Sequence, residues 1–310
     1  MDKPLKIGSM CTGYGGLDHA LEMLYPGSTV TWCSEIDKAA NHLIEKRYGY
    51  DNIGDLTKVE WEKIPKVDAI TAGYPCQPFS VAGKRDLNDE RIIWKYIFNS
   101  VIPLGRPELY LENVRGHLSR GFSGVLSDLA SIGYSARWLC LPASSIGAPH
   151  RRERLFIHAY SDSSRSRKQQ DTRRVRNLDI DSKHTTTRKE PKHRSAEIIS
   201  NSERSYVEKH GLPSRQEQTT ELRKPVSDFD WREYEPAIRR WETILNRPAP
   251  QPVKNNRLNP WFVEFMMGID KGLVCGKDLE LTLTQQLKLL GNGVVKHQAY
   301  EAYRKLLNER

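Results

Sequence analysis

The chain has 310 residues, a formal net charge of +9 and a pI of about 9.2. Apolar residues make up 38% of it, but no run of about 18 of them exists, which argues against a membrane-spanning helix. Residues 1–8 lack the apolar core of a signal peptide. The five cysteines form no CxxC pair, so neither a metal site nor a disulfide framework is indicated. A cytoplasmic protein without a membrane partner is expected, and the positive charge favours a polyanionic partner.

The first 160 residues alternate strand-like and helix-like segments. Strands are expected at residues 5–10, 29–34, 67–72, 109–111, 135–141 and 155–159, and helices at 17–24, 38–48, 91–101 and 125–132. Alternation of this kind predicts an α/β fold with a doubly wound, mostly parallel sheet.

A glycine-rich loop lies between the first strand and the first helix. It contains Cys11, Thr12, Gly13, Gly15, Gly16 and Leu17. Glycines at such a position let the backbone approach a ligand and turn into the helix N-terminus. Glu35 and Ile36 follow at the tip of the second strand, about 20 residues after the glycines, where such folds hold a nucleoside ribose. The pair predicts an adenosine-containing cofactor, with Asp55 and Leu56 further along as candidates for the adenine.

The third strand ends in the most distinctive turn of the chain. Gly73 precedes Pro75-Cys76-Gln77-Pro78, in which the two prolines fix backbone angles on either side of the Cys-Gln pair. The turn places a thiol beyond the carboxyl end of a strand, where parallel sheets bind ligands. Cys76 is therefore a candidate nucleophile, and a proline-rich structural turn is the alternative.

Charged residues follow the fourth strand and precede the last one. Glu112 is expected at the tip of a central strand, where burial raises a carboxyl pKa and suits it to donate a proton. Arg152 and Arg154 are expected to share one face, because side chains two residues apart along a strand point the same way. On that face they could hold a phosphate or a base carbonyl, and a solvated basic surface is the alternative.

The pattern changes after residue 160. Residues 161–224 contain 16 Lys or Arg, 10 Asp or Glu and only 10 apolar residues, so they lack the composition of an ordinary core. Helices are expected again at 233–246, 261–267 and 296–307, with a proline-rich connector at 247–254. Gly291-Asn292-Gly293-Val294 precedes the last helix.

These blocks, in this order, resemble the C5-cytosine-specific DNA methyltransferase family. The resemblance spans nearly the whole chain and rests on the glycine loop, Glu35, Asp55, Pro75-Cys76-Gln77, Glu112-Asn113-Val114, the Arg152-x-Arg154 run and the 291–294 block. It implies the Rossmann-like class I methyltransferase fold and S-adenosylmethionine as cofactor. Cys11 stands where phenylalanine is common in the family, and His150 where glutamine is more common.

The resemblance also implies roles. Cys76 attacks C6 of a flipped-out cytosine in duplex DNA, Glu112 protonates N3, and Arg154, helped by Arg152, binds the base. It further implies that the cofactor is bound by the glycine loop (Cys11, Thr12, Gly13, Gly15, Gly16 and Leu17), Glu35, Ile36, Asp55, Leu56, Gly73, Pro75, Asn292 and Val294. The base that removes the C5 proton is not identified.

The family pattern divides the chain into four parts. Residues 1–160 are expected to form the catalytic and cofactor domain, 161–256 a partly disordered basic insert for target recognition, 257–281 a brace, and 282–310 a return to the catalytic domain. A monomer is expected, in a prokaryotic cell or a phage-infected host, with a cognate restriction endonuclease as one partner.

Three other functions stay open on the sequence alone. An RNA cytosine methyltransferase of the DNA-methyltransferase-like kind is disfavoured because its Cys-Phe-Thr run is absent. A free-nucleotide enzyme of the thymidylate synthase type is disfavoured by the glycine loop, Glu35 and the net charge. A DNA-binding module without activity is disfavoured because the catalytic positions are intact.

Overall fold

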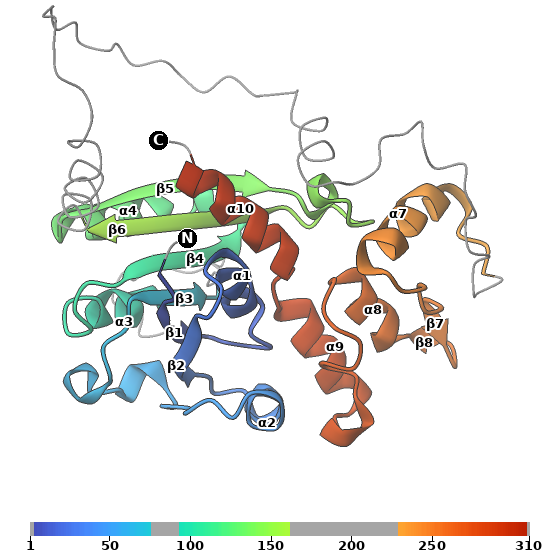
Figure 1. Cartoon of the computed structure of the whole chain (residues 1–310), viewed down its shortest axis with the longest axis horizontal. Coiled ribbons are helices and arrows are strands. Elements are labelled where there is room, and N and C mark those ends of the chain that lie inside the picture. The colour runs from blue at the N-terminus through green and yellow to red at the C-terminus, as the bar shows by residue number, and fades with distance from the viewer. Residues whose placement is uncertain (1–2, 76–92, 162–228, 309–310) are drawn as a thin grey trace, which may run out of the picture. The chain divides into compact units, whose positions relative to one another are not determined.

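A six-stranded sheet forms the centre of the computed structural model, which describes residues 3–75, 93–161 and 229–308 (Figure 1). Cys76, Gln77 and most of the basic segment lie outside these residues. The strand order is β2-β1-β3-β4-β6-β5. The strands are β1 (Lys6–Met10), β2 (Thr29–Ser34), β3 (Ala69–Gly73), β4 (Glu108–Val114), β5 (Tyr134–Leu141) and β6 (Arg154–Ser161).

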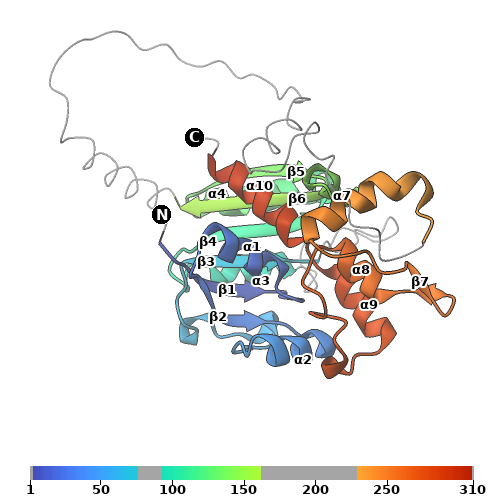
Figure 2. The ribbon, with the colours of Figure 1, turned by 45° about the vertical axis from the view of Figure 1, so that its right-hand side comes forward.

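The sheet is parallel from β2 to β4, and β6 runs antiparallel to both of its neighbours. Figure 2 shows the arrow of β6 reversed against those of β1 and β2. The expected doubly wound, mostly parallel sheet is confirmed, with each expected strand found within a few residues of its predicted bounds.

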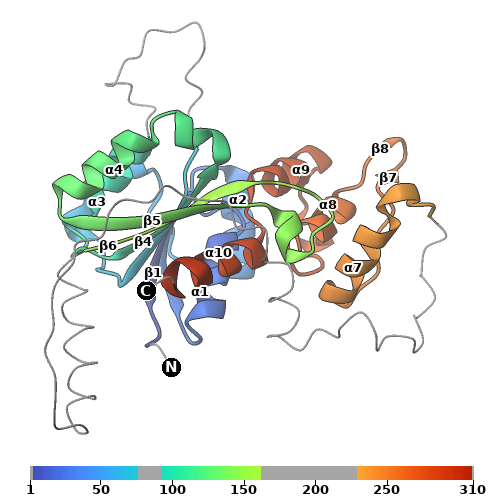
Figure 3. The same cartoon turned by 90° about the horizontal axis from the view of Figure 1, so that it is seen from above.

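Helices cover both faces of the sheet. Figure 3 shows α1 and α10 on one face and α3 and α4 on the other. The helices are α1 (Gly16–Leu24), α2 (Lys38–Arg47), α3 (Ile93–Ser100), α4 (Phe122–Ser131), α7 (Glu235–Leu245), α8 (Pro260–Met266), α9 (Leu283–Asn292) and α10 (Lys296–Asn308). Among the described residues, none of these is long and apolar enough to cross a membrane.

Successive residues of the strands contribute their side chains to two separate apolar cores. Ile7, Tyr110 and Phe156 point into the core under α1 and α10, whereas Ile70 and Leu111 point into the core under α3 and α4. Successive strand residues face opposite sides. The central sheet is therefore buried on both faces, as is usual for parallel sheets.

The last helix, α10, packs against α1, β5 and β6. The Tyr303 hydroxyl donates to the Leu111 carbonyl of β4 at 3.0 Å, and Gln298 Nε2 donates to the carbonyls of Leu141 and Arg152 at 2.7 and 2.8 Å. Both side chains are fully buried. Their hydrogen bonds therefore fix α10 on the sheet, because breaking them would leave buried polar groups unpaired.

Two elements were not expected from the sequence. One is α9, although Thr282 and Gln285 form a complete capping box at its start. The other is a hairpin of β7 (Val253–Lys254), at the end of the predicted proline-rich connector, and β8 (Arg257–Leu258), at the start of the predicted brace. Asn255 and Asn256 form its turn, both with positive φ, as a two-residue hairpin loop requires.

Candidate functional site

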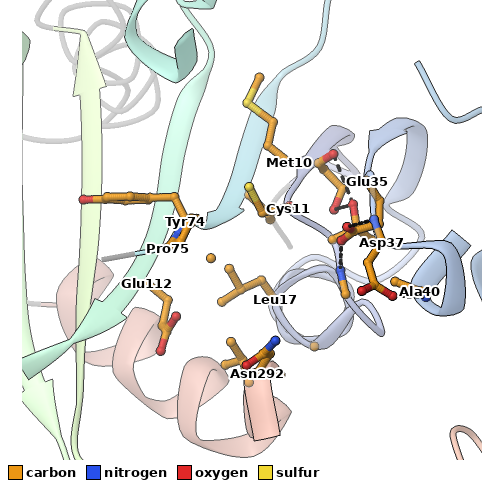
Figure 4. A pocket seen from close by; sticks show the side chains of 18 of the residues that line it. Met10, Cys11, Leu17, Glu35, Asp37, Ala40, Tyr74, Pro75, Glu112 and Asn292 are labelled. Carbon is orange, nitrogen blue, oxygen red and sulfur yellow. Dashed lines mark hydrogen bonds between the residues drawn. The ribbon is translucent and has the colours of Figure 1, made fainter. Parts of the chain in front are cut away.

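A pocket of about 680 Å³ lies at the carboxyl ends of the parallel strands, closed on one side by α9 (Figure 4). Figure 4 shows Glu112 on one side of it and Glu35 on the other. The predicted site residues that line it are Cys11, Thr12, Gly13, Gly16, Leu17, Glu35, Ile36, Asp55, Leu56, Gly73, Pro75, Glu112, Arg154, Asn292 and Val294. Gly15 and Arg152 are not among the lining residues, and Cys76 lies outside the described ones.

The glycine loop depends on backbone conformations that few residues adopt. Gly13 and Gly15 have φ of 57° and 79°, and Cys11 also has a positive φ, of 52°. Gly15, although not on the pocket wall, caps the N-terminus of α1. A Cβ on Gly16 would lie 2.5 Å from the Val294 carbonyl oxygen. The loop therefore follows its tight path only with glycines, and its shape is fixed against the segment before α10.

Tyr14 joins the loop to that segment. Its buried hydroxyl donates to the Val294 carbonyl at 2.7 Å, and the Tyr48 hydroxyl donates to the Tyr14 carbonyl at 2.9 Å. A Cβ on Gly293 would collide with the Tyr14 ring, 1.8 Å away. Residues 293–294 therefore pack directly on the glycine loop, and the two segments form one wall of the pocket.

Glu35 organises the end of β2. One carboxylate oxygen accepts the N–H of Gly13 at 2.9 Å, and the other accepts those of Ile36 and Asp37, each at 2.9 Å. A carboxylate has about four acceptor positions, so hydroxyl donors of a ligand can still bind it. Ile36 is 69% exposed beside the pocket. A solvent-exposed apolar side chain at the edge of a pocket can pack against a flat ring of a ligand.

Asp55 adopts the conformation of a capping turn. Its carboxylate accepts the backbone N–H and the hydroxyl of Thr57 at 3.0 and 2.8 Å. These hydrogen bonds stabilise the ionised form and hold the pKa of Asp55 below its usual value. Asp55 is thus a turn aspartate that also lies on the pocket wall, beside Leu56.

Asp18 is a pocket residue that the sequence reasoning missed. It lies in the first turn of α1, is 1% exposed, and accepts hydrogen bonds from the hydroxyls of Ser9 (2.8 Å) and Thr71. Burial raises the pKa of its carboxyl to about 6. Ser9 and Thr71 lie on β1 and β3, so Asp18 ties α1 to two adjacent strands. The only sequence signal was an acid in the first turn of a helix.

Glu112 and Arg154 form an ion pair at the other end of the pocket. Arg154 Nε lies 3.1 Å from Glu112 Oε1, and Glu112 is 8% exposed. Burial raises the pKa of Glu112 to about 7, against the lowering effect of Arg154 and Arg152. The predicted rise from burial is confirmed. The protonated carboxyl is thus favoured more than in an exposed glutamate, and in that form the side chain can both donate and accept a hydrogen bond.

Arg152 corrects one prediction. It does not share a strand face with Arg154, because β6 begins only at Arg154 and Arg152 has a left-handed φ of 27°. Its guanidinium donates instead to the carbonyls of Gly291 (2.9 Å) and Gly293 (2.6 Å). Arg152 therefore holds residues 291–293 in place, and these residues line the pocket although Arg152 itself does not. His150 Nε2 similarly donates to the Met266 carbonyl at 2.9 Å.

The unexpected helix α9 supplies part of the pocket wall. Its Lys288 forms a salt bridge with Asp37, which caps α2. Asn292 lies at the last position of α9 and is exposed at the pocket. This salt bridge joins α2 to α9 at the pocket, which both residues line.

The cysteines that the structure describes are poor nucleophiles. Burial raises the pKa of Cys11, Cys33, Cys140 and Cys275, and the pKa of Cys11 reaches about 12. A thiol reacts through its thiolate. Cys11 therefore stays protonated at neutral pH although it lines the pocket.

The chain matches a family of known proteins over most of its length. Residues 5–270 match the family model of the C-5 cytosine-specific DNA methylases. The type II methyltransferase M.BsuFI of Bacillus subtilis is 37% identical over 154 residues, 47% of this chain and 36% of that protein. M.DsaV of Dactylococcopsis salina is 34% identical over 168 residues, 52% of this chain and 47% of that protein. The matches thus span half or less of these relatives.

Solved structures agree on the fold. The crystal structure of the Schizosaccharomyces pombe Dnmt2 methyltransferase (S. pombe) has a TM-score of 0.60 and 18% identity, and the alignment covers 98% of this chain and 99% of that one. The Entamoeba histolytica methyltransferase EhMeth has a TM-score of 0.53 and 18% identity, over 99% of this chain and 100% of that one. At these identities the likeness concerns the fold alone.

Proposed function

The chain belongs to the C-5 cytosine-specific DNA methylase family, and from this premise we propose that it transfers a methyl group from S-adenosylmethionine to C5 of a cytosine in duplex DNA. The observation that carries the proposal is the buried Glu112, with its pKa near 7, in the same pocket as the glycine loop and Pro75. The proposed proton donor for the base and the proposed nucleoside site thus lie in one cavity.

The pocket residues fit the cofactor. A Cβ on Gly73 would lie 3.6 Å from Glu112 Oε2 and 3.8 Å from Leu17, so glycine at this position keeps the cavity open. Glu35 offers acceptors for the ribose, and Ile36 an apolar surface for the adenine. When bound, S-adenosylmethionine supplies an electrophilic methyl group on sulfur. The residues Gly13, Leu17, Asp55, Asn292 and Val294 surround the same space.

The chemistry assigned to the chain's own residues follows from the weak nucleophilicity of cytosine C5. The Cys76 thiolate would add to C6 and form an S–C bond, and the electrons of the C5–C6 double bond would move to C5. C5 could then take up the methyl group while the methyl–sulfur bond breaks and leaves a neutral thioether. Glu112 donates its proton to N3 as charge develops there. A base then removes the C5 proton, the N3 proton returns to Glu112, and the S–C6 bond breaks, which expels the thiolate and restores the aromatic ring. A thiolate suits both addition and departure.

Arg154 and Arg152 have separate tasks in this scheme. Arg154 lies on the pocket wall beside Glu112 and binds the cytosine, while Arg152 holds the 291–293 segment in place. The cytosine must leave the duplex to reach the pocket, at a cost of about a few kcal/mol. The basic residues 161–224 supply phosphate contacts that offset this cost.

The expected setting follows from the same premise. We propose that the protein works as a monomer in the cytoplasm of a prokaryotic cell or a phage-infected host. A restriction endonuclease that cuts the same DNA sequence is the proposed partner.

Base-resolution mapping of 5-methylcytosine tests the function. DNA from cells that express the chain is compared with DNA from cells that express Cys76→Ser, which keeps the cofactor pocket but lacks the thiol. Methylation at a defined sequence with the wild type alone is the expected result. Equal methylation by Cys76→Ser would refute the covalent mechanism, and no methylation by the wild type would refute the function.

A further inference from the structure

The hairpin of β7 and β8 carries four polar side chains at its free end. Lys254 and Arg257 are cross-strand partners, and Asn255 and Asn256 form the turn between them. All four residues are exposed, and within the described part of the chain none of their side chains has a hydrogen-bond or ion-pair partner. Their donors and acceptors are therefore available to another molecule.

The base of the hairpin is fixed to the core. Asn259, which follows β8 and is 7% exposed, donates its backbone N–H to the Pro252 carbonyl at 2.9 Å and Nδ2 to the Gln251 carbonyl at 2.8 Å. Its Oδ1 accepts the N–H of Trp261 and so caps α8, and α8 buries Phe265 in the core. The hairpin therefore presents its side chains from a defined position, as base recognition requires.

The hairpin is positively charged and lies on the pocket side of the sheet. Figure 2 shows it on the side toward which the arrows of β1 and β2 point. The helix that follows it, α8, packs against α9, which lines the pocket. Residues 243–263 include three Lys or Arg and no Asp or Glu. This charge complements a polyanion, and the DNA of the proposed function is one.

The dimensions of the hairpin fit a groove of DNA. Successive strand residues point to opposite faces, so Lys254 and Arg257 share one face of the hairpin. Two strands about 4.8 Å apart fit into a major groove about 12 Å wide. The two long basic side chains can then reach phosphates, while the amides of the turn reach the bases. An asparagine amide offers one donor and one acceptor, which match N7 and N6 of adenine.

We propose that this hairpin enters the major groove of the DNA substrate. Lys254 and Arg257 bind phosphates there, and the amides of Asn255 and Asn256 contact base edges and select bases near the methylated cytosine. The inference rests on the proposed function, because it takes duplex DNA as the substrate. It adds base contacts from the hairpin to the phosphate contacts proposed for residues 161–224.

Glycine substitutions in the turn separate base recognition from folding. Asn255→Gly and Asn256→Gly remove the amides but keep the turn, because glycine readily adopts the φ angles of 51° and 56° found there. Asn246→Gly is the matched control, since Asn246 is also exposed with a positive φ, of 49°, but lies at the end of α7. Thermal melting should show no loss of stability in the three variants, so a change in selected bases is not a folding effect.

Selection of duplexes by binding to the full chain, from a library of random sequence, is the first readout. The wild type is expected to enrich a sequence with an adenine for which Asn255→Gly or Asn256→Gly loses the preference, about tenfold or more. Asn246→Gly should enrich the wild-type sequence. A wild type without any sequence preference, or turn variants that keep the full preference, would overturn the base contacts.

The salt dependence of binding to one fluorescent duplex is the second readout. Lys254→Gln and Arg257→Gln should each lower the slope of log affinity against log salt by about 0.9, because each lost phosphate contact releases one counterion fewer. Lys66→Gln should leave the slope unchanged, because Lys66 is an exposed lysine before β3, at the amino ends of the strands. Wild-type slopes in both hairpin variants would refute the phosphate contacts.

Neither readout requires methyl transfer, so the two proposals can fail separately. A wild type that methylates no DNA but binds it through the hairpin would refute the proposed function and support the inference. A wild type that methylates DNA, with selection and salt slopes unaffected by the hairpin variants, would refute the inference alone.

Discussion

Replacing Glu112 by glutamine should remove a pH dependence of stability that the wild-type protein shows near neutrality. In the folded protein the pKa of Glu112 is raised from 4.5 to about 7 by burial. The folded state therefore holds this proton more tightly than the unfolded chain. The resulting stabilisation is fully present below pH 4.5 and is lost as the pH rises through 7.

The size of the effect follows from the shift. A difference of one pKa unit corresponds to 1.36 kcal/mol, so the shift of Glu112 makes the wild type lose about 3 kcal/mol between pH 4.5 and 8. Glutamine has a similar shape, and its side-chain oxygen can still accept from Arg154. The variant therefore lacks the titration without leaving a cavity. Its stability relative to wild type should rise by about 3 kcal/mol over this range.

Urea unfolding of both proteins at several pH values between 5 and 8 measures the difference. Other titrating groups, such as Asp18 with its pKa of about 6, contribute equally to both proteins and cancel in the comparison. Parallel stability curves for the two proteins would show that Glu112 titrates normally, and would remove the basis for its role as proton donor. The same variant should slow methyl transfer by about 10²–10⁴.

The remaining predictions concern the cofactor pocket and DNA binding. Gly16→Ala should destabilise the protein by about 1–3 kcal/mol and weaken cofactor binding, because its Cβ would lie 2.5 Å from the Val294 carbonyl oxygen. The control Gly124→Ala, whose Cβ has no neighbour within 4 Å, should have neither effect. Equal melting temperatures of the two variants would contradict the predicted clash. Glu35→Ala should weaken cofactor binding at least about tenfold, as calorimetry can measure, because three backbone N–H groups lose a charged acceptor; unchanged affinity would exclude Glu35 from the site. DNA affinity should fall steeply with salt if residues 161–224 bind phosphates, and a fluorescence anisotropy titration that is flat in salt would argue against this.

Local patterns predicted the sheet and much of the pocket. Apolar runs bounded by glycine or proline locate the strands, and Glu35 and Glu112 follow two of them directly. No local pattern in the sequence indicates the direction of β6, yet this direction determines which residues meet in the site. Because β6 is antiparallel to β4, its first residue, Arg154, lies at the edge where β4 ends and so meets Glu112. In a parallel strand the same arginine would lie at the opposite edge.

Contacts between distant parts of the chain could not be predicted. The guanidinium of Arg152 binds carbonyls about 140 residues further on, and nothing near Arg152 in the sequence indicates this. Tyr74 and His117 meet because β3 and β4 are neighbours in the sheet, which periodicity does not reveal. For α9 a local signal existed in Thr282 and Gln285, but its residues reach the pocket only through the tertiary fold.

The hydrogen bond between Tyr14 and Val294 joins residues 280 positions apart. It has a consequence for synthesis, because domains form from the N-terminus as the chain leaves the ribosome. All six strands emerge before α9 and α10. Until then the glycine loop lacks the wall on which it packs. A chain that ends before residue 283 therefore has all the strands of the central sheet but lacks the α9 residues that line the pocket.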